Sequence, residues 1–186
     1  MIGFAMCGSF CTHGRALEVL ETLIGHGYDV LPIMSDAAFG TDTRFGTAGE
    51  LRAHVTALCG RSILHTVADA EPLGPRTPLD ALVICPCTGN TLAKLANGIT
   101  DTAVTMAAKA HLRSDRPLLI AAASNDAMSA NLGNMSVLLM RKSVYFVPVV
   151  QDDPIHKPHS LVADFSLVPA ALEAALRREQ LRPMFR

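Results

Sequence analysis

One stretch of sequence predicts the central unit of the fold: Ile84-Cys85-Pro86-Cys87-Thr88-Gly89-Asn90-Thr91-Leu92-Ala93-Lys94-Leu95-Ala96-Asn97-Gly98. The apolar run of residues 81–85 predicts a buried strand, which Pro86 is expected to end. Small polar residues then stand where a helix begins, and the final Asn-Gly pair predicts where that helix ends. A polar turn between the carboxyl end of a strand and the amino end of a helix is where open α/β sheets bind ligands. We therefore look for a ligand at this turn first.

The composition is that of a globular chain of 186 residues, with 49% apolar and 18% charged residues. This length predicts a single domain over residues 1–186. The net charge of −1, the absence of Trp and the presence of only two Tyr make nucleic acid or an anionic membrane an unexpected partner. No apolar run reaches the roughly 18 residues of a membrane span. The start of the chain reads as a strand and not as a signal peptide, and the five cysteines lack a disulfide framework, so we expect a cytoplasmic protein.

Strand and helix patterns alternate along the whole chain. Apolar runs predict six strands, at residues 2–6, 28–34, 63–67, 81–85, 117–123 and 144–149. Apolar residues at helical spacing predict helices between or after these strands. The first helix ends near residue 24, and the others span residues 48–58, 101–113, 132–141 and 169–178. Residues 37–46 and 151–160 are polar and are expected to be irregular. The alternation predicts a three-layer α/β/α sandwich with a six-stranded parallel sheet.

Small polar residues follow four of the predicted strands, and parallel strands bring these ends to one edge of the sheet. They are Gly8-Ser9, Ser35, Thr88 to Thr91, and Ser124-Asn125. Each alone is an ordinary cap or turn, but four at the same edge favour a cleft whose hydroxyls and helix N–H groups suit a phosphate. Neither G-x-G-x-x-G nor a P-loop occurs, so a mononucleotide such as FMN fits better than NAD or ATP.

Several other polar groups have a structural and a functional interpretation. Cys7, Cys11, Cys85 and Cys87 lack the spacing of a zinc site, so no metal is expected. The loop 152–159 could bind a metal or an acidic substrate, although a solvated loop is the simpler interpretation. His65 could act as a general acid or base, or be a structural histidine of a strand. Arg44 is the best-placed cation for a substrate carboxylate, or a surface arginine.

The same residues resemble a known family. The chain resembles the flavoprotein family of homo-oligomeric, flavin-containing cysteine decarboxylases. The similar residues are the Gly8-Ser9 turn, Ser35, the run from Pro86 to Thr91 with Lys94 to Gly98, and the run from Ser124 to Met128. The resemblance covers nearly the whole chain. It implies a flavodoxin-like or Rossmann-like fold, a homo-oligomer such as a trimer or a multiple of one, and FMN as cofactor.

Within that family the chain is most similar to the subfamily of dipicolinate synthase B subunits, through runs such as Thr41 to Gly46 and Gln151 to Pro154. This resemblance implies a partner A subunit that uses NAD(P), and a small dicarboxylate substrate that is oxidised to dipicolinate during sporulation. The implied cofactor-binding residues are Gly8, Ser9, Phe10, Ser35, Pro86, Thr88, Thr91 and Ser124. The implied substrate-binding residues are Asn90, Asn125, Arg44 and Met128.

The chain also departs from the decarboxylase pattern. Cys87 and Gly89 replace the two alanines of the family's Pro-Ala-Ser-Ala-Asn-Thr motif, and the run from Ser124 to Met128 lacks the Pro and Met that precede the family's Asn. No catalytic acid or base stands out, so cofactor chemistry is expected to dominate. Two alternatives remain open, namely an FMN-dependent decarboxylase or flavin prenyltransferase relative, and a non-catalytic supporting subunit.

Overall fold

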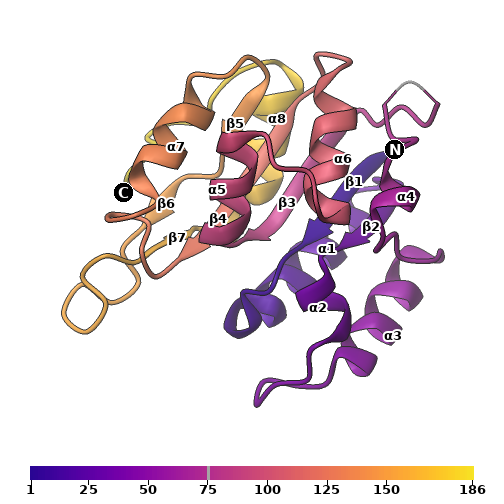
Figure 1. The fold of residues 1–186 in the computed structure, drawn as a ribbon, viewed down its shortest axis with the longest axis horizontal. Coiled ribbons are helices and arrows are strands. Elements are labelled where there is room, and N and C mark those ends of the chain that lie inside the picture. The colour runs from indigo at the N-terminus through magenta and orange to yellow at the C-terminus, as the bar shows by residue number, and fades with distance from the viewer. Residues whose placement is uncertain (75) are drawn as a thin grey trace.

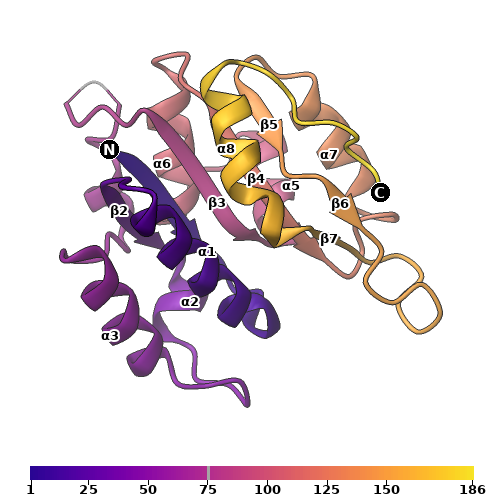
Figure 2. The same cartoon turned by 180° about the vertical axis from the view of Figure 1, so that it is seen from behind.

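The computed structural model describes residues 1–74 and 76–186, which form one mixed sheet with helices on both faces (Figures 1 and 2). The strands are β1 (Ile2–Met6), β2 (Val30–Met34), β3 (Ala81–Cys87), β4 (Leu118–Ser124), β5 (Val144–Phe146), β6 (Val149–Val150) and β7 (Leu161–Ala163). The helices are α1 (His13–Gly25), α2 (Asp36–Gly40), α3 (Ala48–Cys59), α4 (Val67–Ala70), α5 (Gly89–Asn97), α6 (Ala103–Leu112), α7 (Leu132–Leu139) and α8 (Val168–Leu176), with short 3-10 turns η1 (Phe10–Thr12) and η2 (Phe165–Leu167). The predicted sandwich is confirmed.

The two faces of the sheet are covered by different helices. Helices α5, α6 and α7 cover the face seen in Figure 1, and α1, α3 and α8 cover the face seen in Figure 2. Alternate residues of the central strands supply the two cores, since Leu82 and Ile84 of β3 pack in one and Val83 and Cys85 in the other. Both faces are buried, which explains why these strands read as unbroken apolar runs.

The strand order positions the candidate site. The order in the sheet is β2-β1-β3-β4-β7-β6, and β5 pairs with β4 as well. The strands β2, β1, β3 and β4 are mutually parallel, so their carboxyl ends share one edge. From β1 the chain crosses to β2 on one side, and β3 lies on the other side, so a topological switch point lies between β1 and β3. Open α/β sheets bind ligands at such a point.

Three strand predictions need correction. Residues 63–67 form no strand, because Thr66 caps α4 in a capping box with Asp69 and leaves only one bridge between Leu64 and Ile33. Pro86 does not end β3, which continues to Cys87 after a shift of register against β4. The run 144–149 is divided into β5 and β6.

Two segments expected to be irregular contain or adjoin regular structure. The segment 37–46 starts inside the short helix α2. Directly after the loop 151–160, β7 pairs antiparallel with the last residues of β4 and with β6. The sheet is therefore mostly parallel, with two antiparallel pairs at one end. The loop separates β6 from β7 by only ten residues, which suits an antiparallel return and is too short for a helical crossover.

Candidate functional site

The turn between β3 and α5 presents free helix N–H groups at the switch point. Thr88 is the N-cap of α5, and its Oγ1 accepts a hydrogen bond from the Thr91 N–H at 3.3 Å. Gly98 ends the helix in the left-handed conformation at φ 70°, as the sequence predicts. The positive end of a nine-residue helix thus lies at the carboxyl end of β3, where it favours an anion.

A chain of hydrogen bonds joins this turn to the end of β1. The Thr88 hydroxyl donates to Thr91 Oγ1 at 3.1 Å, and the Thr91 hydroxyl donates to Cys7 Sγ at 3.3 Å. Burial raises the pKa of the Cys7 thiol to about 11, against the opposite effect of its hydrogen bonds with Thr91 and Thr88. A buried thiol with a raised pKa is a poor nucleophile, and Cys7 packs in the core.

The first turn after β1 lines the sheet edge and leaves little room for a side chain at residue 8. A Cβ at Gly8 would lie 3.0 Å from Ala37 Cβ and 3.4 Å from Phe10 Cζ, so a side chain there would fill the space. Within the described residues, Ser9 makes no capping hydrogen bond through its side chain, which leaves its hydroxyl available. Ser35 caps α2 and accepts a hydrogen bond from the Ala38 N–H at 3.3 Å.

These turns line two adjoining hollows along the sheet edge. One, of about 380 Å³, lies between the ends of β2, β1 and β3. The other, of about 440 Å³, lies between the ends of β1, β3 and β4. Gly8, Thr88 and Asn90 line both hollows. We call the two together the edge cleft.

The end of β4 adds a polar wall to the edge cleft. Asp126 accepts hydrogen bonds from the Ser124 hydroxyl and, at 2.9 Å, from the Asn131 amide. The hydrogen bond from Ser124 is the main reason that the pKa of Asp126 lies below its usual value. Asn125, the neighbouring residue, is exposed and lines the cleft.

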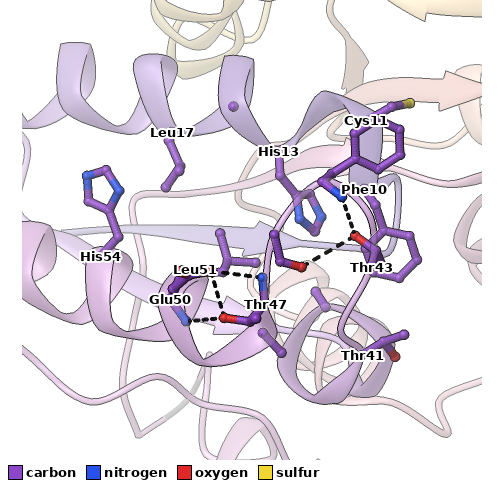
Figure 3. Close-up of a pocket in the computed structure, with 15 residues that line it drawn as sticks. Phe10, Cys11, His13, Leu17, Thr41, Thr43, Thr47, Glu50, Leu51 and His54 are labelled. Atoms are coloured by element: carbon purple, nitrogen blue, oxygen red, sulfur yellow. Dashed lines mark hydrogen bonds between the residues drawn. The ribbon is translucent and has the colours of Figure 1, made fainter.

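A third hollow, of about 410 Å³, adjoins the edge cleft at Phe10 (Figure 3). Phe10, Cys11 and Phe45 line both this hollow and the edge cleft. His13 forms a 2.8 Å hydrogen bond through Nε2 with the Cys7 carbonyl, and burial lowers its pKa. This hollow was not predicted from the sequence, because it is formed by α1, α3 and the loop before α3.

Comparison with known proteins identifies the family. The model of the family described as "Flavoprotein" matches residues 1–165. The chain is 42% identical to the B subunit of dipicolinate synthase from Bacillus subtilis (strain 168) over 183 residues, which is 98% of this chain and 92% of that protein. The chain belongs to the flavoprotein family.

Other similarities agree with this family. The crystal structure of the dipicolinate synthase B subunit from Bacillus halodurans C has a TM-score of 0.91 and 40% identity, and the match covers 100% of this chain and 95% of that one. The flavin prenyltransferase UbiX of Methanothermobacter thermautotrophicus is 34% identical over 91 residues, which is 48% of this chain and 47% of that protein. The FMN-dependent cysteine decarboxylase SpaF shares the fold at a TM-score of 0.71 and 24% identity, over 95% of both chains.

The flavoprotein fold brings most of the predicted site residues together. The edge cleft is lined by Gly8, Ser9, Phe10, Ser35, Thr88, Asn90, Thr91, Ser124 and Asn125. Three predicted residues do not line it. Pro86 is buried in β3, where its carbonyl accepts the Cys7 N–H at 3.1 Å. Arg44 is exposed and lies over the Phe45 ring, and Met128 packs partly buried against the core.

Three cations line the edge cleft, namely Arg15, Lys94 and Lys157. Arg15 lines the edge cleft and lies over the Phe165 ring, with 4.7 Å between its Cζ and the ring centroid. Lys157, from the loop before β7, lines the same cleft and pairs with Asp152 at 3.1 Å. Arg15 lies six residues after Ser9, on the first turn of α1, and Lys157 belongs to the loop 152–159, which the sequence marks as a possible site for an acidic substrate.

Of the other candidates, Cys7, Cys11 and part of the loop 152–159 line the edge cleft, and His65 lies outside it. His65 stacks on Phe39 with ring centroids 3.8 Å apart, and its Nδ1 lies 3.8 Å from Asp69 Oδ2. Among the described residues, no three His, Cys, Asp or Glu side chains group as metal ligands would. No helix in the described part of the chain is both long and apolar enough to cross a membrane.

Proposed function

We propose that the chain is the flavin-type B subunit of a dipicolinate synthase and binds FMN in the edge cleft. With an A subunit that uses NAD(P), it oxidises a dihydrodipicolinate precursor to pyridine-2,6-dicarboxylate for spores. The similarity to two dipicolinate synthase B subunits at 42% and 40% identity supports the reaction and the partner. The flavoprotein family and the FMN-dependent relatives support the cofactor. The main structural support for the proposal is that the polar turns line one cleft at the carboxyl ends of the parallel strands.

The chain's residues fit FMN by their chemistry. The α5 N-terminus, the Ser9 hydroxyl and the close approach allowed at Gly8 suit the phosphate, with Ser35 nearby in the smaller hollow. Thr88 would contact the flavin from the shared part of the cleft. Bound FMN would supply a two-electron acceptor.

The substrate side of the cleft lies toward β4. Asn90 and Asn125 present amides that can hydrogen-bond a carboxylate, and both are exposed. Oxidation of the dihydropyridine removes one hydride and one proton, and the product ring becomes aromatic. The hydride goes to a bound cofactor, either FMN here or NAD(P) on the A subunit. We further propose that the B subunit works in the cytoplasm as a homo-oligomer.

Reconstitution tests this proposal. The purified chain should bind FMN, seen as quenching of flavin fluorescence and a visible absorbance band. Dihydrodipicolinate oxidation should require both subunits. Ser9→Asp should abolish flavin loading by placing a negative charge against the phosphate. A chain that takes up no flavin, or an A subunit that is fully active alone, would refute the proposal. Carbon dioxide release from a cysteine-terminated peptide would instead favour the decarboxylase alternative.

A further inference from the structure

Gly89, the first residue of α5, lies against the polar wall at the end of β4. A Cβ built at Gly89 would lie 2.5 Å from Asn131 Nδ2 and 2.8 Å from Asp126 Oδ1, and closer still to Ser124 Oγ. Gly89 is helical and is not among the residues with positive φ, so its backbone does not require glycine. The missing side chain instead makes room for these three polar groups.

The three polar side chains next to Gly89 form a hydrogen-bonded group that orients the Asp126 carboxylate. Asp126 Oδ1 accepts hydrogen bonds from both the Ser124 hydroxyl and the Asn131 amide. The Asp126 carbonyl also accepts the N–H groups of Ser129 and Asn131, each at 3.1 Å. Side chain and backbone are thus both held, and the carboxylate has one orientation.

The second carboxylate oxygen of Asp126 is not used by the hydrogen bonds of the described residues. Within the described residues, Asp126 Oδ2 accepts no hydrogen bond, although the side chain is exposed and lines the edge cleft. An ionised carboxylate only accepts hydrogen bonds, so its partner must be a donor. Bonds to a charged acceptor are stronger than neutral ones.

We propose that Asp126 is a ligand-binding residue whose Oδ2 accepts a hydrogen bond from the ring N–H of a bound nitrogen heterocycle. This inference rests on the proposed function, in which the cleft takes two nitrogen heterocycles: the flavin, which carries a ring N–H at N3, and a dihydropyridine substrate, which offers one in its 1,2- or 1,4-dihydro form. Gly89, Ser124 and Asn131 act as positioning residues for this carboxylate.

The test is Asp126→Asn. Ser124 and Asn131 both donate to Oδ1, so the new amide keeps its oxygen there and turns its NH2 toward the ligand. Donor then faces donor, and affinity should fall about 10-fold or more, since a hydrogen bond to a charged group contributes about 1.5–3 kcal/mol. The FMN Kd, from fluorescence quenching, and the dihydrodipicolinate KM of the A–B complex are both measured. A higher Kd assigns the bond to flavin, and a higher KM alone assigns it to substrate.

Asp115→Asn is the matched control. Asp115 pairs with Lys142 at 2.6 Å, before the amino end of β4 and thus at the opposite edge of the sheet. The Asp115→Asn substitution removes the same charge as Asp126→Asn and should leave the FMN Kd and the dihydrodipicolinate KM within about twofold of wild type. Ser124→Ala keeps the carboxylate but removes one orienting donor, and should weaken the same constant by about threefold.

The outcomes separate this inference from the proposed function. FMN binding by the wild-type chain tests the proposed function. The inference is tested by comparing Asp126→Asn with wild type, through the ratio of their FMN Kd values and the ratio of their dihydrodipicolinate KM values. Asp126→Asn and Ser124→Ala with Kd and KM both within twofold of wild type would overturn it, and so would equal losses in Asp115→Asn. Circular dichroism confirms that each variant is folded.

Discussion

Replacing Thr88 by alanine separates the capping role of this residue from its role in the cleft. Thr88 Oγ1 accepts the Thr91 N–H and donates to the Thr91 hydroxyl, which in turn donates to Cys7 Sγ. The substitution removes the side-chain cap of α5 and leaves the Thr91 hydroxyl without its donor. Thr88 also lines both hollows of the edge cleft.

The magnitude has two parts. Loss of a threonine N-cap costs about 1 kcal/mol of unfolding free energy. For a chain of this length, that lowers Tm by about 2–4 °C. Loss of one neutral hydrogen bond to the flavin would cost a further 0.5–1.5 kcal/mol of binding free energy, or about 2- to 10-fold in FMN Kd.

Thr47→Ala provides the matched control. Thr47 caps α3 in a capping box with Glu50 and lines the third hollow, not the edge cleft. Its loss should lower Tm by a similar amount and leave the FMN Kd unchanged. Thermal unfolding by circular dichroism gives Tm, and titration of flavin fluorescence gives Kd. If Thr88→Ala lowers Tm but leaves the FMN Kd at the wild-type value, Thr88 is a cap alone and our assignment of it to the flavin is wrong.

Three other variants or conditions have defined expected results. Asn90→Asp should raise the dihydrodipicolinate KM about 10-fold, because it places a negative charge against a dicarboxylate; an unchanged KM in the A–B complex would remove Asn90 from the site. Burial lowers the pKa of His111 below 6.5, and the Pro117 carbonyl, 2.9 Å from Nε2, only partly opposes this. The unfolded chain therefore binds this proton first, and stability should fall as the pH drops below about 6.5, by up to about 1.36 kcal/mol per pH unit. Urea unfolding between pH 7 and 5 measures that slope, which His111→Gln should reduce; an equal slope in the variant would contradict the assignment. Cys11 is exposed, while Cys7, Cys85 and Cys87 are buried with raised pKa values, so a thiol reagent should modify Cys11 first in the folded chain. Cys11→Ser should remove that fast phase. Because Cys59 is partly exposed, only fast labelling of Cys7, Cys85 or Cys87 would show that the core opens.

Local patterns were enough to predict the strand–turn–helix unit at Thr88. Its strand is an apolar run, its cap is a threonine and its end is a glycine, and each of these effects acts within a few residues. The same reasoning failed at residues 63–67, where the capping box of Thr66 and Asp69 competes with a short apolar run. It also missed β7, because that strand has only three residues and is stabilised by β4 and β6.

The layered α/β fold and the edge of the sheet where polar turns gather could thus be predicted from local patterns. Periodicity, caps and turns are properties of neighbouring residues, and parallel strands bring successive ends to one edge. Which side chains share the cleft depends on contacts between distant segments and is seen only in the folded chain. Arg15 and Lys157 enter it and Arg44 does not, because long-range packing sets these positions. The tertiary structure also explains why residue 89 is a glycine, since residues 124, 126 and 131 occupy the space that a side chain there would need.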